Sequence, residues 1–378
     1  MRILQMQGAY IVDYIRTPFT PARKGALAAT RPDELAGGLL STMVERSGFP
    51  AEEIEDIILG CAFPEGEQGL NIARCAALHA GLPQTIAGST VNRWCGSSMQ
   101  AIQMAAGAIA MGAGDAFLAG GVESMTRVPM MGFNPLPNPA WPSDRRMSLL
   151  NMGLTAEILA DRYGITRAEQ DDYAAKSQSK ALAAQSEGRL SDEIASSADT
   201  DKDGCPRQTS VEKLAGLQPV FRADGSVTAG NSSPLTDGAS LTLICSENFV
   251  KRHSLVPLAR IVGYAVSGCA PEIMGIGPVE ATRKALARSA ISAADLDVIE
   301  MNEAFAAQVL ACCRELDIDP ARLNPDGGAI ALGHPLGATG ARLAGKAARL
   351  LVRGGGRYGL ATQCIGGGQG IAMVLEAA

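Results

Sequence analysis

The chain has 378 residues, of which 47% are hydrophobic and 19% are charged, and this balance excludes an intrinsically disordered protein. The length is sufficient for two domains, each with its own hydrophobic core. A net charge of -6 excludes a strongly basic surface for nucleic acid, so an anionic ligand would need a local basic pocket.

The N-terminal sequence MRILQMQGAYIVDYIRTPF lacks the basic and apolar regions of a secretory signal. The most apolar stretch, residues 99–121, is rich in Ala and Gly and contains Asp115, so we expect no membrane span. The nine cysteines form no C-x-x-C pair and have no zinc-like spacing to His. We therefore expect no metal and a reducing compartment, the cytoplasm.

The first part of the chain, residues 1–117, alternates segments of helical and strand periodicity. We predict helices over 34–47, 71–79 and 98–111 and a buried strand over 54–60. Residues 118–234 follow as an inserted segment with the Pro-rich stretch PMMGFNPLPNPAWPSDRR and one helix over 167–187. Long insertions of this kind usually bind ligands or cover sites.

The second part of the chain repeats the order of the first. Helices are predicted over 279–290, 304–316 and 340–352, and a strand over 296–301. The linker SGFPAEEIEDIILG aligns with SAISAADLDVIEMN. This pattern predicts a duplicated α/β unit, with an N-terminal domain of residues 1–117 plus 235–257, a loop domain of 118–234 and a C-terminal domain of 258–378.

Cys95 lies in STVNRWCGSSMQAI, between an extended run and a helix start rich in small residues. The N-terminus of a helix favours the thiolate, the form in which cysteine acts as a nucleophile. The alternative is a buried cysteine that only fills space.

The chain has three histidines, and His334 is the candidate general base. His79 ends an apolar helix and His253 lies in a charged segment, where packing or exposure explains each of them. His334 instead lies in DGGAIALGHPLGATGAR, whose glycines let the backbone approach a ligand. The alternative is a turn with an incidental histidine, and the phosphate-binding motifs G-x-G-x-x-G and G-x-x-x-x-G-K-[ST] are absent here.

Two further segments carry candidate polar groups. Cys364 in LATQCIGGGQGIAMVLE precedes three glycines, and it is either a proton donor or a cysteine without a role. Asn302 and Glu303 in EMNEAFAAQ lie at a predicted strand-to-helix turn, where ordinary N-capping by Asn302 is the alternative to a catalytic role.

Five motifs together resemble the thiolase family, in the same order and over the whole chain: VNRWCGSSMQ, GNSSPLTDGA, NEAFAAQ, GGAIALGHPLGATGAR and CIGGGQG. The degradative branch, the 3-ketoacyl-CoA thiolases of fatty-acid β-oxidation, is the most similar. CGSSMQ and MGLTAEILADRYGITRAEQD resemble the thiolase subunit of the bacterial oxidation complex. The resemblance implies a five-layered αβαβα fold of two similar halves with a loop domain.

The resemblance also implies roles for individual residues. Cys95 matches the acylated nucleophile, His334 its base and Cys364 the acid/base at the acetyl carbon. Asn302 matches the residue that holds a water in one oxyanion hole, to which His334 also donates. The backbone N–H groups of Cys95 and Gly366 match the second oxyanion hole.

The family binds CoA as a co-substrate and holds no permanent cofactor. The residues of this chain that match its CoA contacts are Met152, Arg207, Phe221, Ser233, Ala304 and Phe305. The chain departs from the family's phosphate contacts at Gly216 and Gln218, where relatives often carry Lys and Arg. We expect a homodimer or homotetramer, with a subunit of a β-oxidation complex as the alternative.

Three alternatives to a degradative thiolase remain at this stage. Acetoacetyl-CoA thiolase is the first, although Asn151 stands where the short-chain biosynthetic enzymes typically have His. A decarboxylating ketoacyl synthase lacks the terminal C-x-G-G-G motif that contains Cys364. A non-catalytic acyl-CoA-binding protein is expected to have lost a catalytic group, and none of those named above is missing.

Overall fold

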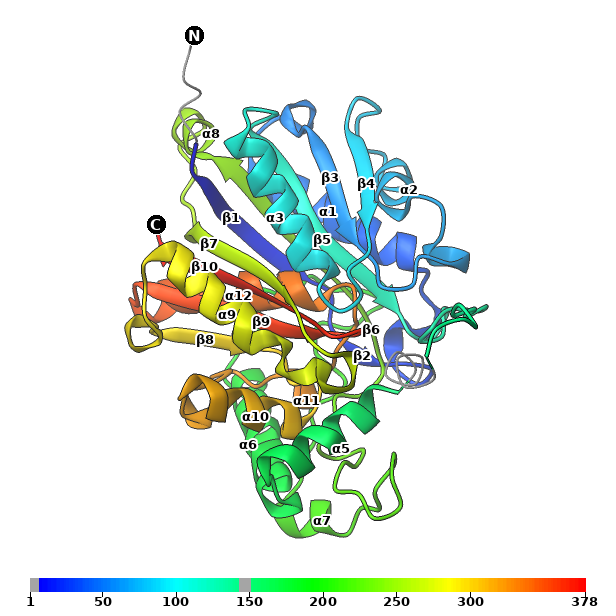
Figure 1. Cartoon of the computed structure of the whole chain (residues 1–378). Coiled ribbons are helices and arrows are strands. Elements are labelled where there is room, and N and C mark those ends of the chain that lie inside the picture. The colour runs from blue at the N-terminus through cyan, green and yellow to red at the C-terminus, as the bar shows by residue number, and fades with distance from the viewer. Residues whose placement is uncertain (1–6, 143–150) are drawn as a thin grey trace.

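The fold is that of a computed structural model, which describes residues 7–142 and 151–378 (Figure 1). Two stretches used above lie outside the described residues: the first six residues, which are part of the expectation of no secretory signal, and the SDRR end of the Pro-rich stretch. In the part described, ten strands form one hydrogen-bonded sheet in the order β4-β3-β5-β6-β1-β7-β10-β9-β8, with β2 paired to β6.

The first half of the molecule contains the strands on one side of this order. Its elements are β1 (Ala9–Arg16), β2 (Thr20–Pro21), α1 (Pro32–Ser47), β3 (Asp56–Gly60), α2 (Ile72–His79), β4 (Ala87–Val91), α3 (Ser97–Ala110), β5 (Ala116–Ser124), β6 (Thr236–Ser246) and α8 (Glu247–Arg252). β3 pairs in parallel with both β4 and β5, whereas β6 runs antiparallel to β5 and β1. The helices and the strand predicted here are confirmed to within two residues.

The second half repeats this topology. Its elements are β7 (Ala259–Gly268), α9 (Gly277–Ser289), β8 (Val298–Met301), α10 (Ala306–Leu316), α11 (Ala329–Leu332), α12 (Thr339–Gly354), β9 (Tyr358–Ile365) and β10 (Gln369–Ala377). The order β8-β9-β10-β7 matches β3-β5-β6-β1. In the place of β4, a single parallel bridge joins Leu323 to Ile299 of β8. The predicted duplication is confirmed.

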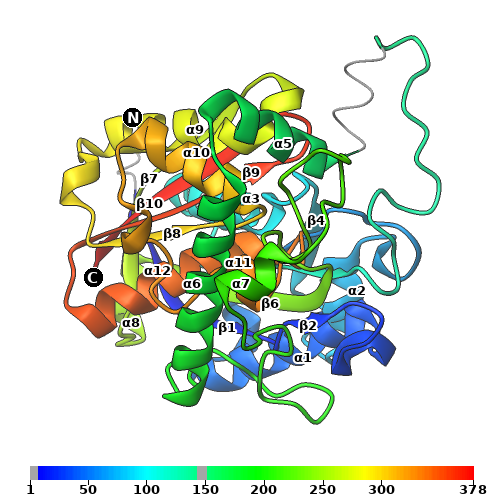
Figure 2. The ribbon, with the colours of Figure 1, turned by 90° about the horizontal axis from the view of Figure 1, so that it is seen from below.

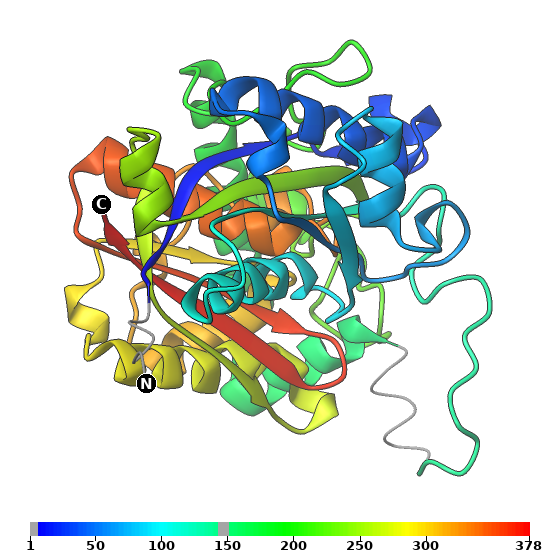
Figure 3. The same cartoon turned by 90° about the horizontal axis from the view of Figure 1, so that it is seen from above.

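Three hydrophobic cores divide the molecule into five layers. One core lies between α1, α2 and the first set of strands, and another lies between α9, α10 and the second set. The central core contains α3 and α12 together, between the two sets of strands. Figure 3 shows this order from α1, in blue, to α9, in yellow. Within residues 7–142 and 151–378, the two sets of strands pair through two residue pairs of β1 and β7. The order of the layers confirms the αβαβα architecture.

The two central helices approach each other closely. A Cβ atom on Gly340, near the start of α12, would lie 2.5 Å from the backbone nitrogen of Met99 in α3. No side chain fits at this distance, so the contact requires glycine. It brings the helix that follows Cys95 against the helix that follows His334.

The helices of the inserted segment lie beside the second half, seen from below in Figure 2, whereas the stretch that follows β5 lies beside the first half, where Arg127 and Phe133 bond to Glu67 and Glu65. The inserted segment contains α5 (Met152–Tyr163), α6 (Arg167–Ser186) and α7 (Val211–Ala215). α6 begins with a capping box between Thr166 and Glu169. β5 continues to Ser124, beyond the domain boundary that we expected at residue 117. All nine residues of β5 are buried, so no alternation of apolar and polar residues marks the end of the strand in the sequence.

Short 3-10 helices connect several of these elements. They are η1 (Ala26–Ala29), η2 (Ala51–Glu53), η3 (Gly66–Gln68), η4 (Pro271–Ile276), η5 (Ala293–Asp295) and η6 (Pro320–Arg322). Among the helices described, none is both long and apolar enough to cross a membrane.

Candidate active site

A cavity of about 310 Å³ lies where the two halves meet the inserted segment. Ten of the residues singled out in the sequence line it: Cys95, Asn151, Met152, Phe221, Ser233, Ala304, Phe305, His334, Cys364 and Gly366. They come from both halves and from the insertion, so the fold brings together residues up to 271 positions apart (366 minus 95).

Cys95 lies in a tight turn between β4 and α3. Trp94, the residue before it, has a φ of 42°, which is uncommon for a residue with a side chain. The Asn92 Oδ1 atom accepts the Trp94 N–H at 2.8 Å, and the Ser97 hydroxyl donates to the Trp94 carbonyl at 2.6 Å. These two bonds hold the strained conformation, and with it the position of the Cys95 side chain.

In this structure, burial opposes the thiolate form of Cys95 that a helix N-terminus favours. Burial raises the pKa of Cys95 to about 11, although the backbone N–H groups of Gly366 and Cys95 itself lower it. The Glu123 carboxylate raises this pKa further. Desolvation of the charged sulfur outweighs the helix N-terminus, so the resting group is a thiol.

His334 is held in one orientation by two threonines. Its backbone N–H donates to Thr236 Oγ1 at 2.7 Å, and its Nδ1 lies 2.6 Å from Thr339 Oγ1. The Thr339 hydroxyl donates to the Pro335 carbonyl at 3.0 Å, so its oxygen accepts a hydrogen bond from Nδ1–H. This arrangement favours the tautomer in which Nε2 is free to act as a base.

Asn302 contacts the other ring nitrogen of His334. Its Nδ2 lies 3.3 Å from Nε2, and the side chain is fully buried. The N-cap of α10 is Phe305, without a side-chain cap, so the capping alternative for Asn302 is wrong. The Asn302 Oδ1 atom is buried and has no protein partner among the described residues, a condition that a bound water or ligand would relieve.

The ionisation of His334 and Cys364 is governed by burial. Burial lowers the pKa of His334 to about 3, with a smaller lowering from Arg342. Burial also raises the pKa of Cys364 well above its usual value, and the neighbouring Cys95 adds to this rise. A neutral imidazole and two neutral thiols therefore share the site.

The residues matched to CoA contacts surround one end of the cavity, with one exception. Phe221 and Phe305 pack edge to face with ring centroids 6.0 Å apart. The Ser233 N–H donates to the Ala304 carbonyl at 3.0 Å. Arg207 does not line the cavity: its side chain is exposed, and its backbone N–H binds Gln178.

Sequence reasoning missed the apolar residues that complete the wall. They are Met125, Met130, Leu235, Met274 and Leu336. Leu235 and Leu336 lie inside two of the predicted motifs, Met130 lies in the Pro-rich stretch and Met125 lies just before it, whereas no predicted motif lies near Met274. It also missed Glu123, a buried carboxylate described below.

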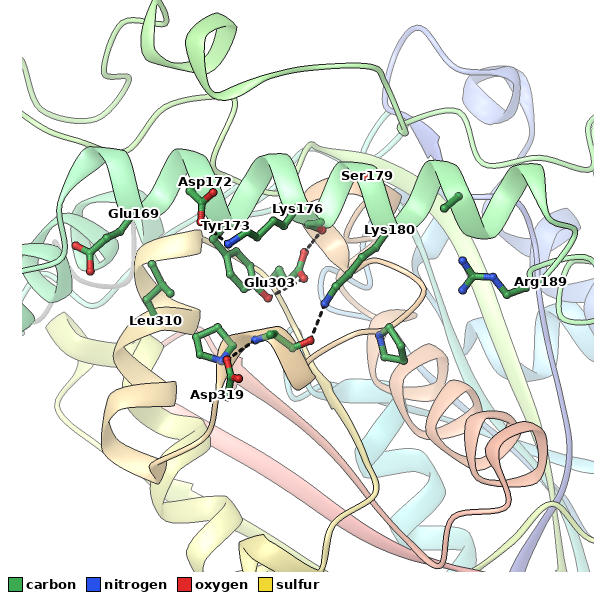
Figure 4. Close-up of a pocket in the computed structure, with 15 residues that line it drawn as sticks. Glu169, Asp172, Tyr173, Lys176, Ser179, Lys180, Arg189, Glu303, Leu310 and Asp319 are labelled. Atoms are coloured by element: carbon green, nitrogen blue, oxygen red, sulfur yellow. Dashed lines mark hydrogen bonds and ion pairs between the residues drawn. The ribbon is translucent and has the colours of Figure 1, made fainter.

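A second cavity, of about 550 Å³, lies between α6 and α10 (Figure 4). Glu303 faces it and accepts hydroxyl hydrogen bonds from Tyr173 at 2.9 Å and Ser177 at 2.6 Å. Lys180 crosses to the Leu323 carbonyl at 2.6 Å. Neither cysteine of the first cavity lines this one. Glu303 therefore joins α6 to the loop beside Asn302.

Within residues 7–142 and 151–378, no group of three or more His, Cys, Asp or Glu side chains could hold a metal ion.

Family models match nearly the whole chain. The model described as "Thiolase, N-terminal domain" matches residues 9–248, and "Thiolase, C-terminal domain" matches residues 255–377.

Full-length relatives and solved structures agree with these matches. The chain is 45% identical to a 3-oxoadipyl-CoA/3-oxo-5,6-dehydrosuberyl-CoA thiolase of Escherichia coli K12 and 46% identical to a 3-ketoacyl-CoA thiolase of Colwellia psychrerythraea, each over 98% of this chain and 100% of the relative. The crystal structure of the Bacillus anthracis acetyl-CoA acetyltransferase superposes with a TM-score of 0.91 at 41% identity, covering 99% of this chain and 100% of that one. Human mitochondrial 3-ketoacyl-CoA thiolase in complex with CoA superposes with a TM-score of 0.90 at 39% identity, covering 98% of both chains.

Proposed function

The chain belongs to the thiolase family of acyltransferases, and on this premise we propose that it cleaves 3-ketoacyl-CoA with free CoA, giving acetyl-CoA and a shortened acyl-CoA. The observation that carries the proposal is the meeting of Cys95, His334 and Cys364 in one cavity, with Asn302 against His334. This chemistry fits a degradative enzyme of fatty-acid β-oxidation.

In the first step, Cys95 attacks the 3-keto carbon and its thiol proton passes to His334 Nε2. The tautomer held by Thr339 supports this role, because Nε2 carries no proton of its own. Since both groups start neutral, the charge separates only as the sulfur bonds to carbon. The attack gives a tetrahedral oxyanion at the former keto carbon. Only cleavage of its bond to the α carbon leaves the acyl group on Cys95 as a thioester, which remains reactive toward a second thiol.

The bond between the α and β carbons breaks next, and acetyl-CoA leaves as an enolate. Cys364, a thiol beside Cys95, donates the proton to the enolate carbon. Asn302 and His334 stabilise one oxyanion, Asn302 through a bound water. The N–H groups of Cys95 and Gly366 stabilise the other. Free CoA then takes the acyl group from Cys95: the CoA thiol proton passes to Cys364, and the departing Cys95 sulfur regains the proton held by His334.

We assign CoA to the cavity end formed by Met152, Phe221, Ser233, Ala304 and Phe305. CoA is a co-substrate, and the scheme needs no permanent cofactor. Arg207 can contact a CoA phosphate only if that phosphate extends beyond the cavity. We propose that the loop domain of residues 118–234, without its residues in β5, holds CoA between the two thiolase halves.

The expected compartment and assembly also remain proposals. All nine cysteines are free thiols, which suits a reducing, cytoplasmic location for an enzyme with a thiol nucleophile. β4 is an edge strand, and such an edge can pair with a second copy of the chain. We propose a homodimer or homotetramer, with membership of a β-oxidation complex as the alternative.

Acetoacetyl-CoA thiolysis is the second candidate, favoured by the likeness to an acetyl-CoA acetyltransferase structure. The apolar wall of Met125, Met130, Leu235 and Leu336 favours longer acyl chains, because burial of each further methylene contributes about 0.8 kcal/mol.

Thiolysis rates with 3-ketoacyl-CoA substrates of increasing chain length test the proposal. We expect turnover beyond the four-carbon substrate, and a loss of about 10⁴-fold or more in Cys95→Ser, as for removal of other nucleophiles. Cys75→Ser, a half-buried cysteine in α2, is the matched control and should keep wild-type rates. Activity confined to acetoacetyl-CoA would contradict the degradative assignment, and full activity in Cys95→Ser would contradict the mechanism.

A further inference from the structure

Glu123 is a buried carboxylate without a cation. It lies near the end of β5, 1% exposed, and forms no ion pair within the described residues. By contrast, the buried acid Glu193 pairs with Arg16 at 2.9 Å and with Lys346 at 2.8 Å. A buried charge of this kind persists only where hydrogen-bond donors satisfy it. The donors to Glu123 therefore show which segments of the chain it holds together.

Each oxygen of Glu123 accepts hydrogen bonds from loops that border the cavity. Oε2 accepts the backbone N–H of Ala62 at 2.7 Å and that of Gly337 at 2.8 Å. Oε1 accepts the Phe63 N–H at 3.2 Å and the Gln68 side-chain amide at 2.8 Å. Since both oxygens face donors only, the arrangement suits a carboxylate and not its neutral amide isostere.

One of these bonds leads to the general base. Gly337 lies three residues after His334, in the loop that ends at α12. The same loop crosses β5, because a Cβ atom on Gly121 would lie 2.1 Å from the Gly337 carbonyl oxygen. The Glu123 carboxylate therefore fixes the His334 loop against the sheet.

The other bonds lead to the nucleophile. The Ala62 carbonyl accepts the Asn92 side-chain amide at 3.0 Å, and Asn92 Oδ1 accepts the Trp94 N–H at 2.8 Å. Trp94 is the strained residue before Cys95. A continuous path of hydrogen bonds thus runs from Glu123 through Ala62 and Asn92 to the turn that carries Cys95.

We propose that Glu123 is a positioning residue for the thiolase reaction: its carboxylate fixes the Cys95 turn and the His334 loop relative to each other. Its negative charge also raises the pKa of the Cys95 thiol. The inference rests on the proposed function. Cys95 packs against the cluster that contains Ala62 and Leu336, next to the donors of this carboxylate, and Cys364 and His334 line the same cavity as Cys95. Burial raises the pKa of the Glu123 carboxyl, and its hydrogen bonds oppose this rise. The Glu123 charge adds to the desolvation that keeps the Cys95 thiol protonated.

Glu123→Gln tests both parts of this role. The amide nitrogen would face backbone donors, so the loops should separate, and misplacement by about 1 Å costs about 100-fold in rate. We therefore expect kcat to fall about 100-fold while KM stays close to wild type. Alkylation of Cys95 by iodoacetamide, followed by mass spectrometry of its peptide, should shift to lower pH because the negative charge is lost.

Two further variants separate charge from position. Glu123→Asp keeps the charge but cannot reach both loops, so kcat should fall while the pH curve of Cys95 alkylation stays near wild type. Asp237→Asn is the matched control: Asp237 is also buried, pairs with no cation in the described chain and accepts from Thr126 and Ser124. It should leave the alkylation curve unchanged.

The proposal is overturned if folded Glu123→Gln keeps wild-type kcat, or if its alkylation curve does not move. Should Glu123→Gln not fold, Asn92→Ala tests the path at its other end, and wild-type kcat in that variant overturns the proposal. Absence of thiolase turnover in the wild type would instead refute the proposed function, while the alkylation curves would still report on the charge of Glu123.

Discussion

At the scale of single residues, the site is defined by groups that are uncharged at rest. Burial raises the pKa of Cys95 to about 11 and lowers that of His334 to about 3. A thiolate-imidazolium pair is therefore disfavoured before substrate binds. The cavity stabilises charge only where it develops during the reaction, through Asn302 and the N–H groups of Cys95 and Gly366.

The role of Cys364 predicts a specific kinetic defect. In Cys364→Ser, exchange of the acetyl-CoA methyl protons with solvent should slow more than acylation of Cys95 by an acyl-CoA, because a serine hydroxyl is the weaker acid. Isotope exchange and mass spectrometry of the acyl-enzyme measure the two steps. Equal losses in both would remove the acid/base role of Cys364.

His334 also predicts a pH dependence of stability. Its pKa is about 3 in the folded chain and about 6.5 when unfolded, so the unfolded state binds more protons between these values. The stabilisation is complete above pH 6.5 and is lost as the pH falls toward 3.

Wild type should therefore lose about 2 kcal/mol more stability than His334→Asn between pH 7 and about 5. Urea unfolding at the two pH values measures the difference. Identical losses in the two proteins would show that His334 titrates normally in the fold.

At the scale of elements, the two central helices set the distance between nucleophile and base. α3 follows Cys95 and α12 follows His334, and Gly340 allows their backbones to touch. A change in this contact moves both loops at once, because the helices share one core. Stability and activity are thus coupled at this contact.

Gly340→Ala should destabilise the fold by about 1–3 kcal/mol through overpacking and should also lower kcat. Thermal unfolding and thiolysis rates check the two effects. Gly107→Ala in α3 is the matched control, because a Cβ there meets nothing within 4 Å. It should stabilise α3 by about 0.5–1 kcal/mol. Wild-type kcat in Gly340→Ala would show that the helix contact does not position the site.

At the scale of the whole molecule, a buried network of charges joins the inserted segment to both halves. Arg16 of β1 pairs with Glu193 at 2.9 Å and Asp203 at 2.6 Å, both in the insertion. Lys346 of α12 pairs with Glu193 at 2.8 Å and Asp326 at 2.7 Å. These contacts hold the insertion, which forms one wall of the cavity, against the thiolase halves.

Lys346→Met should cost about 3–5 kcal/mol, because it leaves buried carboxylates without their cation. Urea unfolding of the full chain measures this loss. Lys251→Met in α8 is the control, since its ion pair with Glu247 is exposed and should leave stability near wild type. A small loss in Lys346→Met would indicate that water or relaxation satisfies Glu193 and Asp326.

Local patterns in the sequence determined much of this protein. Apolar periodicity located α1, α2, α3, α9, α10 and α12 to within two residues, since a helix repeats its buried face every three to four positions. The motifs around Cys95, His334 and Cys364 identified the family, because each motif is a short run of consecutive residues that can be recognised without the fold. β4 was predicted only as an extended run before Cys95 and without a start, because its small, partly exposed residues AGSTV show no alternation.

Only the tertiary structure decided the state of the site. The thiol form of Cys95, the tautomer of His334 and the contact of Asn302 depend on burial and on partners from other segments. Glu123 gave no sequence signal, because its donors at Ala62 and Gly337 are backbone groups brought to it by folding. Desolvation and long-range hydrogen bonds arise from packing, and a linear pattern of residue types does not contain them.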